Sequence, residues 1–192
     1  MAMGRPMKFG ADEVIDKAVE VFWRQGFAAT TPQNLVDELG IGKGSLYNTF
    51  KSKHHLFELS LRRYSAKRVA ALSDGLEGPG PILPRLREAM RTLAGIGDHR
   101  FGCLIVNSVA ELGSADEGVA EVAKELFGQI EAAFRSAIER GQAAGEITSR
   151  RRPPGDSAGA LLAAVIGTSV LAKSGSDPAY LNRTLDAALQ DL

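Results

Sequence analysis

The sequence predicts an all-α protein of about nine helices, with a three-helix N-terminal domain followed by a C-terminal helical bundle. Apolar residues recur at helical spacing along the chain, and no strict alternation of apolar and polar residues is long enough to predict a strand. Hydrophobic residues make up 44% and charged residues 24% of the 192 residues, which is typical of a globular protein. Glycines and proline-containing pairs divide the helical stretches and so set the number of helices.

The first helices are marked by their ends. An apolar stripe from residue 15 to residue 22 predicts the first helix, and Gly26 ends it as a left-handed cap. Thr31 as N-cap and Pro32 at the first helical position predict the start of the second. Gly40 then breaks the chain before a third, short helix.

The later helices follow the same signals. Ser52 is expected to cap a longer helix, and the segment 75–84 (GLEGPGPILP) is the clearest break in the chain. Residues 114–117 have the form of a capping box before the most regular helix. An apolar helix is expected over 158–172, and Asp177-Pro178 starts the last one.

Charge is unevenly distributed although the net charge is zero. Between residues 39 and 68 there are seven Lys and Arg residues and one acid, Glu58. Such a cluster indicates either that this end of the molecule meets a polyanion or that it is a solvated helix face.

The chain is expected to be a cytoplasmic protein without a membrane span. Its single cysteine, Cys103, fits a reducing compartment, and the first residues have no apolar signal segment. The longest stretch without a charge, 157–172, is shorter than the ~20 residues that a bilayer requires.

The stretch ELGIGKGSLYNTFKSK (38–53) poses the functional question, because its alternating glycines resemble a phosphate-binding loop. Lys43 precedes Gly44, whereas a P-loop has its lysine after the last glycine, and Ser45 stands where a dinucleotide fingerprint has glycine. Both loops also follow a strand, and the preceding segment has helical spacing. A helix-turn-helix fits better, because its tight turn usually contains glycine.

In a helix-turn-helix the second helix presents its polar side to the major groove of DNA. Apolar residues on both sides of the turn are expected to pack together, which leaves a polar, outward set on the second helix. An ordinary helical hairpin without a nucleic-acid partner is the alternative.

These residues resemble the N-terminal domain of TetR-type (TetR/AcrR) transcriptional regulators. The residues that carry the resemblance are Phe22, Gly26-Phe27, Thr30-Thr31, Leu35, Gly40-Ile41, Lys43 to Tyr47, Phe50 to Lys53 and Leu56. The resemblance implies a ligand-responsive repressor that binds a palindromic double-stranded operator as a homodimer. It also implies a DNA-binding domain at residues 1–52 and an effector-binding and dimerisation domain at residues 53–192.

The resemblance also assigns site residues, position by position. The expected DNA contacts are Thr31, Gln33, Lys43, Gly44, Ser45, Tyr47, Asn48, Thr49 and Lys53. Asn48 either reads an adenine through a bidentate pair or contacts phosphate or water. Thr49 stands where an aromatic residue or histidine is more usual in the family, which affects the choice of operator.

The resemblance implies an effector cavity between the C-terminal helices, and its apolar walls with few polar groups suit an apolar or amphipathic small molecule. The candidate pocket residues are Met90, Leu93, Phe101, Cys103, Val106, Asn107, Phe127, Ile130 and Phe134. For each apolar residue the alternative is plain core packing. For Cys103 the alternatives are a reactive thiol at a helix start and a small apolar core residue.

The helix over 158–172 is apolar on nearly every side, which predicts that it pairs with its twin in a four-helix dimer interface together with the last helix. The expected interface residues are Leu162, Val165, Ile166, Leu181 and Leu185.

Two other classes of function compete with a DNA-binding regulator. An enzyme has little support, because the sequence shows no nucleophile–base signature and no metal-spaced set of His and Cys, and the adjacent His54 and His55 are expected to diverge on a helix. We therefore expect no enzymatic activity, no metal and no cofactor. A helical dimeric interaction module without DNA binding is the remaining alternative, and salt-dependent, sequence-specific binding to duplex DNA would separate it from a regulator.

Overall fold

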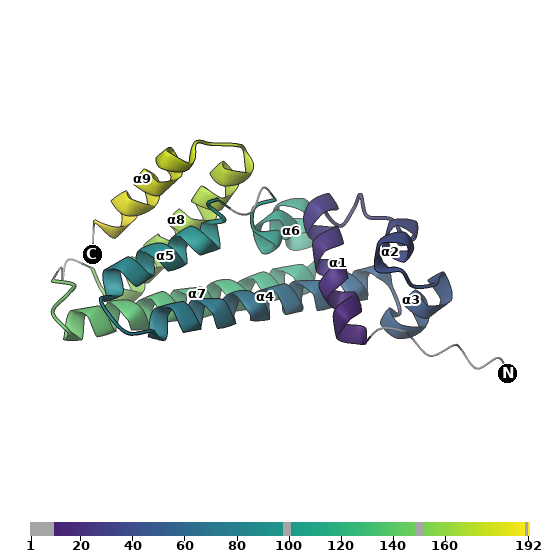
Figure 1. The fold of residues 1–192 in the computed structure, drawn as a ribbon, viewed down its shortest axis with the longest axis horizontal. Helices are drawn as coiled ribbons and strands as arrows, with labels where there is room; N and C mark the ends of the chain where they lie inside the picture. Colours follow the sequence, from purple (N-terminus) through teal and green to yellow (C-terminus); the bar gives the residue numbers. More distant parts are fainter. Residues whose placement is uncertain (1–9, 98–100, 149–151, 191) are drawn as a thin grey trace.

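The computed structural model describes residues 10–97, 101–148, 152–190 and 192, and within them the chain forms nine α-helices, one short 3-10 turn and no strand (Figure 1). The all-α prediction is confirmed. The elements are α1 Ala11–Gln25, α2 Pro32–Leu39, α3 Lys43–Phe50, α4 Lys53–Glu77, α5 Ile82–Ala94, α6 Leu104–Leu112, the 3-10 turn Gly113–Ala115, α7 Glu117–Ala143, α8 Pro154–Lys173 and α9 Pro178–Leu189.

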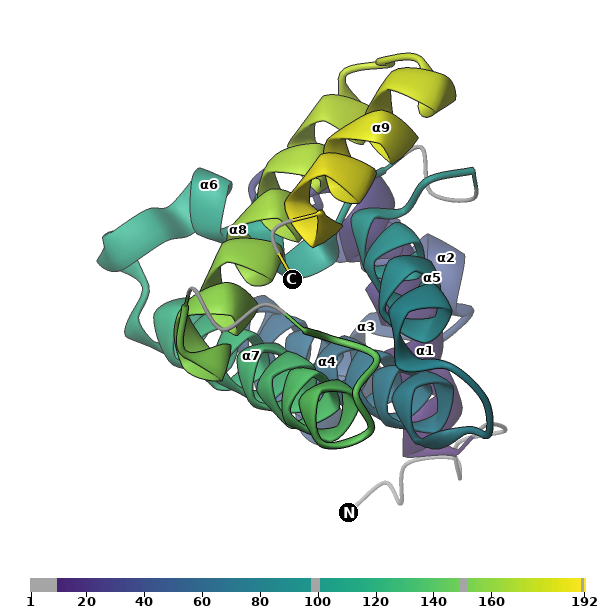
Figure 2. The ribbon, with the colours of Figure 1, turned by 90° about the vertical axis from the view of Figure 1, so that its left-hand side faces the viewer.

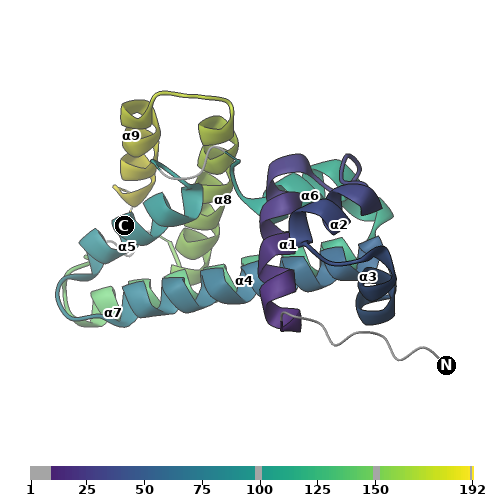
Figure 3. The ribbon, with the colours of Figure 1, turned by 45° about the vertical axis from the view of Figure 1, so that its right-hand side comes forward.

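The helices form an elongated molecule with the N-terminal helices at one end (Figures 1 and 3). Helices α4 and α7 lie side by side and run the length of the molecule in the same direction. At the far end α5 and α8 lie over them, and α9 packs on α5 and α8 (Figure 2). Helix α6 lies beside α1, so a C-terminal element reaches the N-terminal domain.

Several helix ends follow from the sequence signals. Thr31 caps α2 through a reciprocal capping box with Asn34, and Ser52 accepts a hydrogen bond from the His55 N–H at 3.0 Å to cap α4. Gly40 takes the left-handed conformation with φ 66°, which lets α2 stop sharply before the turn.

Two predicted helix starts need correction. The N-cap of α7 is Asp116, whose Oδ1 accepts from the Val119 N–H at 3.1 Å, whereas Ser114 belongs to the preceding 3-10 turn. Helix α8 begins at Pro154, earlier than predicted, because a proline at the first helical position has no amide hydrogen to leave unpaired.

One hydrophobic core extends through both parts of the molecule. At the N-terminal end, Phe22 of α1 meets Phe57 of α4 edge to face, with ring centroids 4.9 Å apart. The start of α4 therefore packs with the first three helices, so α4 joins the two predicted domains rigidly. The boundary at residue 52 stays a prediction.

Helix α8 is the one helix of the described chain that is long and apolar enough to cross a membrane by length and composition. It packs against α5, α7 and α9 in the bundle.

Candidate nucleic-acid interface and effector pocket

The turn between α2 and α3 is fixed by a small apolar cluster. Leu35 and Leu39 of α2, Ile41 of the turn, and Leu46 and Phe50 of α3 are all buried. Burial on both sides of the glycine turn sets the angle between the helices and leaves the opposite face of α3 outside.

The outer face of α3 is polar and accessible. Five of the predicted contact residues are exposed and Ser45 is half-buried; the exposed five are Lys43, Gly44, Tyr47, Asn48 and Thr49. Tyr47 is 38% exposed, which is unusual for a large aromatic side chain within a small domain. No described atom lies within 4 Å of where a Cβ on Gly44 would stand, so the interior does not require glycine there. A small residue on this face leaves room for close approach from outside.

The two predicted contacts on α2 are also exposed. The Thr31 hydroxyl donates to Asn34 Oδ1 at 2.7 Å as part of the helix cap, and the Gln33 amide donates to Asp37 at 2.8 Å. Both side chains lie at the N-terminal end of α2, where free backbone N–H groups and the helix dipole favour a phosphate.

Lys53 has a structural role that the resemblance does not imply. Its ammonium donates hydrogen bonds of 2.9 Å to the backbone carbonyls of Phe27 and Thr30, and it lies 4.0 Å from the centroid of the Phe27 ring. Burial lowers the pKa of Lys53 below its ordinary value, and the carboxylate of Glu111 opposes that effect. Lys53 therefore ties the start of α4 to the loop between α1 and α2.

Glu111 holds the same loop from the other side. Its carboxylate, at the end of α6, accepts hydrogen bonds from the backbone N–H groups of Phe27 at 3.0 Å and Ala28 at 2.7 Å. Gly26 has φ 80°, a backbone conformation that favours glycine, and a Cβ there would lie 2.9 Å from this carboxylate, which would have to shift. We call residues 26–30 with Lys53 and Glu111 the loop clamp.

A second junction joins the starts of α4 and α7. His54 Nε2 lies 2.6 Å from Asp116 Oδ2, and the two oxygens of Glu58 each lie 3.7 Å from a histidine ring, one from His54 and one from His55. The prediction that the two histidines diverge is therefore wrong, because both rings lie near the carboxylate of Glu58, one helical turn further along α4. One ligand atom each from His54, Glu58 and Asp116 lies within 4.8 Å of the others.

Burial raises the pKa of Asp116, but the hydrogen bonds from His54 and from the Val119 N–H outweigh it, so the pKa of Asp116 stays below its ordinary value. The carboxylate is thus ionised at the N-terminus of α7, where the helix dipole favours negative charge.

Five of the nine predicted pocket residues line one small cavity between α4, α5, α6, α7 and α8. They are Leu93, Cys103, Val106, Phe127 and Ile130. Its volume of about 20 Å³ is room for about one water molecule, so these side chains are packed together as core. Cys103 is half-buried here, and its reactivity stays a prediction.

The other four predicted pocket residues lie elsewhere. Met90 and Phe134 are fully buried in the core. Phe101 and Asn107 line a separate, more polar depression beside α1, where the Asn107 amide donates to the Phe101 carbonyl at 2.7 Å and its oxygen accepts from Lys173 at 2.9 Å. Asn107 is therefore engaged outside the small cavity, apart from the other predicted pocket residues.

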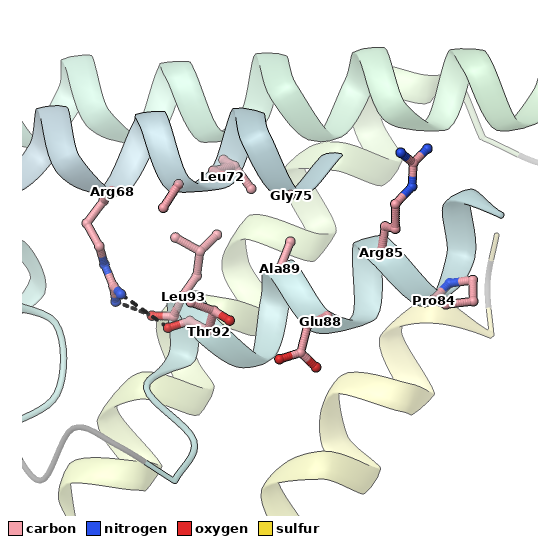
Figure 4. Close-up of a pocket in the computed structure, with 10 residues that line it drawn as sticks. Arg68, Leu72, Gly75, Pro84, Arg85, Glu88, Ala89, Thr92 and Leu93 are labelled. Atoms are coloured by element: carbon pink, nitrogen blue, oxygen red, sulfur yellow. Dashed lines mark hydrogen bonds between the residues drawn. The ribbon is translucent and has the colours of Figure 1, made fainter. Parts of the chain in front are cut away.

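A larger cavity of about 270 Å³ lies between α4 and α5, and the sequence analysis missed it (Figure 4). We call it the α4–α5 groove. It is lined by Arg68, Ala71, Leu72, Gly75, Pro84, Arg85, Glu88, Ala89, Thr92 and Leu93. The signal that could have found it is the pair of small residues Ala71 and Gly75 one helical turn apart on α4, since small side chains leave space between packed helices.

The predicted dimer interface also needs correction. Leu181 and Leu185 are only 2% and 1% exposed, because they pack between helices of the same chain. Val165 is buried, and together with the half-buried Leu162 and Ile166 it lines the small cavity. The sequence could not show which side of an all-apolar helix faces inward.

The exposed side of α8 is a stripe of small and apolar residues at helical spacing, and α9 carries a further exposed aromatic residue, Tyr180. The stripe consists of Ala160, Ala163, Gly167 and Val170. Val170 is 53% and Tyr180 46% exposed, so an apolar surface remains uncovered on the single chain.

Comparison with known proteins agrees with this geometry. Residues 14–59 match the family model "Bacterial regulatory proteins, tetR family", and residues 82–188 match "Tetracyclin repressor-like, C-terminal domain". Together the two models cover most of the chain, including the helix-turn-helix and the bundle.

Individual relatives extend over most or all of the chain. The uncharacterized HTH-type transcriptional regulator YezE of Bacillus subtilis (strain 168) is 28% identical and is matched over 99% of this chain and 100% of its own length. The HTH-type transcriptional repressor ComR of Escherichia coli (strain K12) is 30% identical over 75% of this chain and 70% of its own. The TetR family regulator CifR, solved with a 26-base-pair operator DNA, has a TM-score of 0.83 and 26% identity over 97% of this chain and 98% of its own.

Proposed function

The chain belongs to the tetR family of bacterial regulatory proteins and is a DNA-binding transcriptional regulator, and within that family we propose that it is a ligand-responsive repressor that binds a palindromic operator as a homodimer. The observation that carries the proposal is the exposed polar face of α3. Apolar packing orients this face outward, where its side chains offer hydrogen-bond donors and acceptors. Packing inside the protein does not require glycine at position 44, so the small residue there is free to serve a close approach from outside.

Recognition divides between two kinds of contact. Lys43 at the start of α3, with Thr31 and Gln33 at the start of α2, supports phosphate binding that positions the protein on the duplex. Tyr47, Asn48 and Thr49 on the exposed face of α3 support reading of base edges in the major groove.

The homodimer is proposed to form through the exposed stripe of α8 and Tyr180 of α9, in place of the leucines predicted from sequence. Small residues allow two α8 helices to approach closely, and the uncovered apolar surface gives the association its driving force. Two-fold pairing of this kind places two α3 helices on the two half-sites of a palindrome.

The loop clamp supports coupling between the two halves of the molecule. Residues 26–30 precede α2 directly, and they are held by Lys53 from α4 and by Glu111 from α6. A ligand that favours a different position of α4 or α6 would therefore move the helix-turn-helix formed by α2 and α3. This would shift the population away from the form that fits the operator. Since operator DNA is its target, we place the protein in the cytoplasm.

The test is footprinting of the purified protein on the DNA upstream of its own gene. We expect a protected palindrome whose affinity falls steeply with salt concentration, because phosphate contacts release counterions. Absence of any sequence-specific footprint on genomic DNA fragments would favour a helical interaction module or an enzyme instead.

A further inference from the structure

The α4–α5 groove has the size and walls of a site for a small ligand. Its volume of about 270 Å³ lies near the small end of the range of roughly 300–1,000 Å³ for ligand pockets. Leu72 of α4 faces Ala89 and Leu93 of α5 across the groove (Figure 4), and with Ala71, Gly75 and Pro84 these residues make most of the wall apolar. The cavity between the predicted pocket residues, at about 20 Å³, has no such space.

Arg85 lines the groove and brings a positive charge to it. Its Nε and Nη1 atoms are buried and have no hydrogen-bond partner among the described residues. Glu88, the carboxylate that lines the groove, pairs with Arg91 at 3.5 Å. A buried charged donor left unpaired is costly, so an anion that reaches Arg85 is strongly favoured.

Arg68, at the other end of the groove, is already bonded. Its guanidinium donates to the carbonyls of Thr92 at 3.3 Å and Leu93 at 3.0 Å, which are among the last carbonyls of α5 (Figure 4). Arg68 therefore closes that end and joins α4 to α5. The groove thus has an arginine at each end and an apolar middle, and at Arg85 the buried Nε and Nη1 have no partner among the described residues.

We propose that the α4–α5 groove is the effector site and that the effector is a small apolar carboxylate, the chemistry of a medium-chain fatty acid. The carboxylate pairs with Arg85, whose planar fork of donors matches two carboxylate oxygens. The apolar chain lies between Leu72 and Ala89. The proposal rests on the proposed function, because an effector presupposes a regulator.

The position of the groove explains how its occupant acts on DNA binding. Helix α4 forms one wall and begins at Lys53 of the loop clamp, and the same helix holds α1 through Arg63, whose guanidinium donates to Asp16 at 2.8 and 2.9 Å. An alkyl chain inserted between α4 and α5 moves α4, and the N-terminal helices that contain the helix-turn-helix move with it.

Calorimetry on the protein without DNA tests the site, with sodium octanoate and 1-octanol as matched probes. We expect octanoate to bind once per chain and octanol, which lacks the charge, at least about tenfold more weakly. Arg85→Gln is expected to weaken octanoate by about tenfold or more, with partial recovery in Arg85→Lys. Arg87→Gln is the control, since Arg87 is exposed and lies on the same helix.

Ala89→Met tests the apolar half of the groove, because the longer side chain fills it without removing a charge, and we expect it to abolish octanoate binding. Circular dichroism melts identify variants that unfold. Equal affinity for octanoate and octanol, equal loss in Arg85→Gln and Arg87→Gln, undiminished binding by Ala89→Met, or no octanoate binding at millimolar concentration would each overturn the proposal.

A gel-shift assay on the footprinted operator tests the effector role. We expect octanoate to release wild-type protein at the concentrations that saturate it in calorimetry, and not to release Arg85→Gln. Octanoate binding without release would overturn the effector role and leave DNA recognition intact. Failure to bind any operator without ligand would instead contradict the proposed function, while the calorimetry would be unaffected.

Discussion

Two lysines near the helix-turn-helix show how little residue type says about role. Lys43 is exposed at the first position of α3, whereas Lys53 donates to two backbone carbonyls and lies over an aromatic ring. Both match the family pattern and both are basic, so the sequence predicts the same role for them, a contact with DNA. The structure shows that the Lys43 ammonium is open to solvent, whereas the Lys53 ammonium makes hydrogen bonds within the protein.

The lysine pair yields the first prediction. Lys53→Met leaves the carbonyls of Phe27 and Thr30 without their donor, so we expect the free energy of unfolding to fall by about 1–3 kcal/mol, together with weaker binding to every DNA sequence. Lys43→Met should leave stability unchanged and reduce the slope of log affinity against log salt by about 1. Urea unfolding and salt-dependent binding measure the two effects. Equal stability loss in both variants would contradict this assignment.

Asn48 carries the second prediction. Its side chain is exposed on the outer face of α3, in the position to read a base edge. Asn48→Ala is expected to cost about 1–3 kcal/mol on the best operator and to relax the preference at one position of each half-site. Selection of binding sequences from a random pool checks this. An unchanged preference with uniformly weaker binding would mean that Asn48 contacts phosphate.

Among the elements, α8 departs most from its prediction. A helix that is apolar on every side gives no periodicity to show which side faces the core. In the structure the inward side of α8 holds Leu161 and Val165 together with small residues such as Ala158, and the exposed stripe consists of Ala160, Ala163, Gly167 and Val170. Neither polarity nor size separates the two sides of the helix, so only its packing against α5, α7 and α9 shows which side faces inward.

The exposed stripe gives the third prediction. Ala163→Glu places two carboxylates against each other across the proposed two-fold axis, so we expect the dimer to dissociate while each chain stays folded. Ala132→Glu on α7, also an exposed alanine on a long helix, is the matched control. Analytical ultracentrifugation measures the mass. A dimeric Ala163→Glu variant would show that the interface lies elsewhere.

At the scale of the whole molecule, α4 connects every part. It packs with α1 at one end, beside α7 along its length, and against α5 at the other end. The ion pairs that Asp16 of α1 makes with Arg63 and Lys67 of α4 are part of this connection. Hydrogen bonds from these two cations hold the pKa of Asp16 well below its ordinary 3.8.

This connection gives the fourth prediction, on pH. A carboxylate with a lowered pKa in the folded state stabilises the protein fully above its unfolded pKa, and that contribution is lost as pH falls toward the folded value. Wild type is therefore expected to lose stability below about pH 4. Asp16→Asn should melt at a lower temperature than wild type at pH 7, with a smaller gap at pH 3. Asp74→Asn, at an exposed position of α4, is the control, and a gap that does not narrow on acidification would contradict the assignment.

The sequence by itself determined the local structure and the helix-turn-helix. Helical periodicity gave the all-α fold, Thr31, Gly40 and Ser52 set helix ends through short-range hydrogen bonds and backbone conformation, and the residues around Gly40 identified the family. These signals are local in the chain, so sequence reasoning reached them.

Only the tertiary structure decided the internal tie of Lys53, the inward leucines of α9 and the groove at Arg85. Each depends on which side of one helix meets another helix distant in sequence. Periodicity predicts that a helix has a buried side but not what covers it, so cavities, interfaces and unpaired charges emerge only when the helices are packed together.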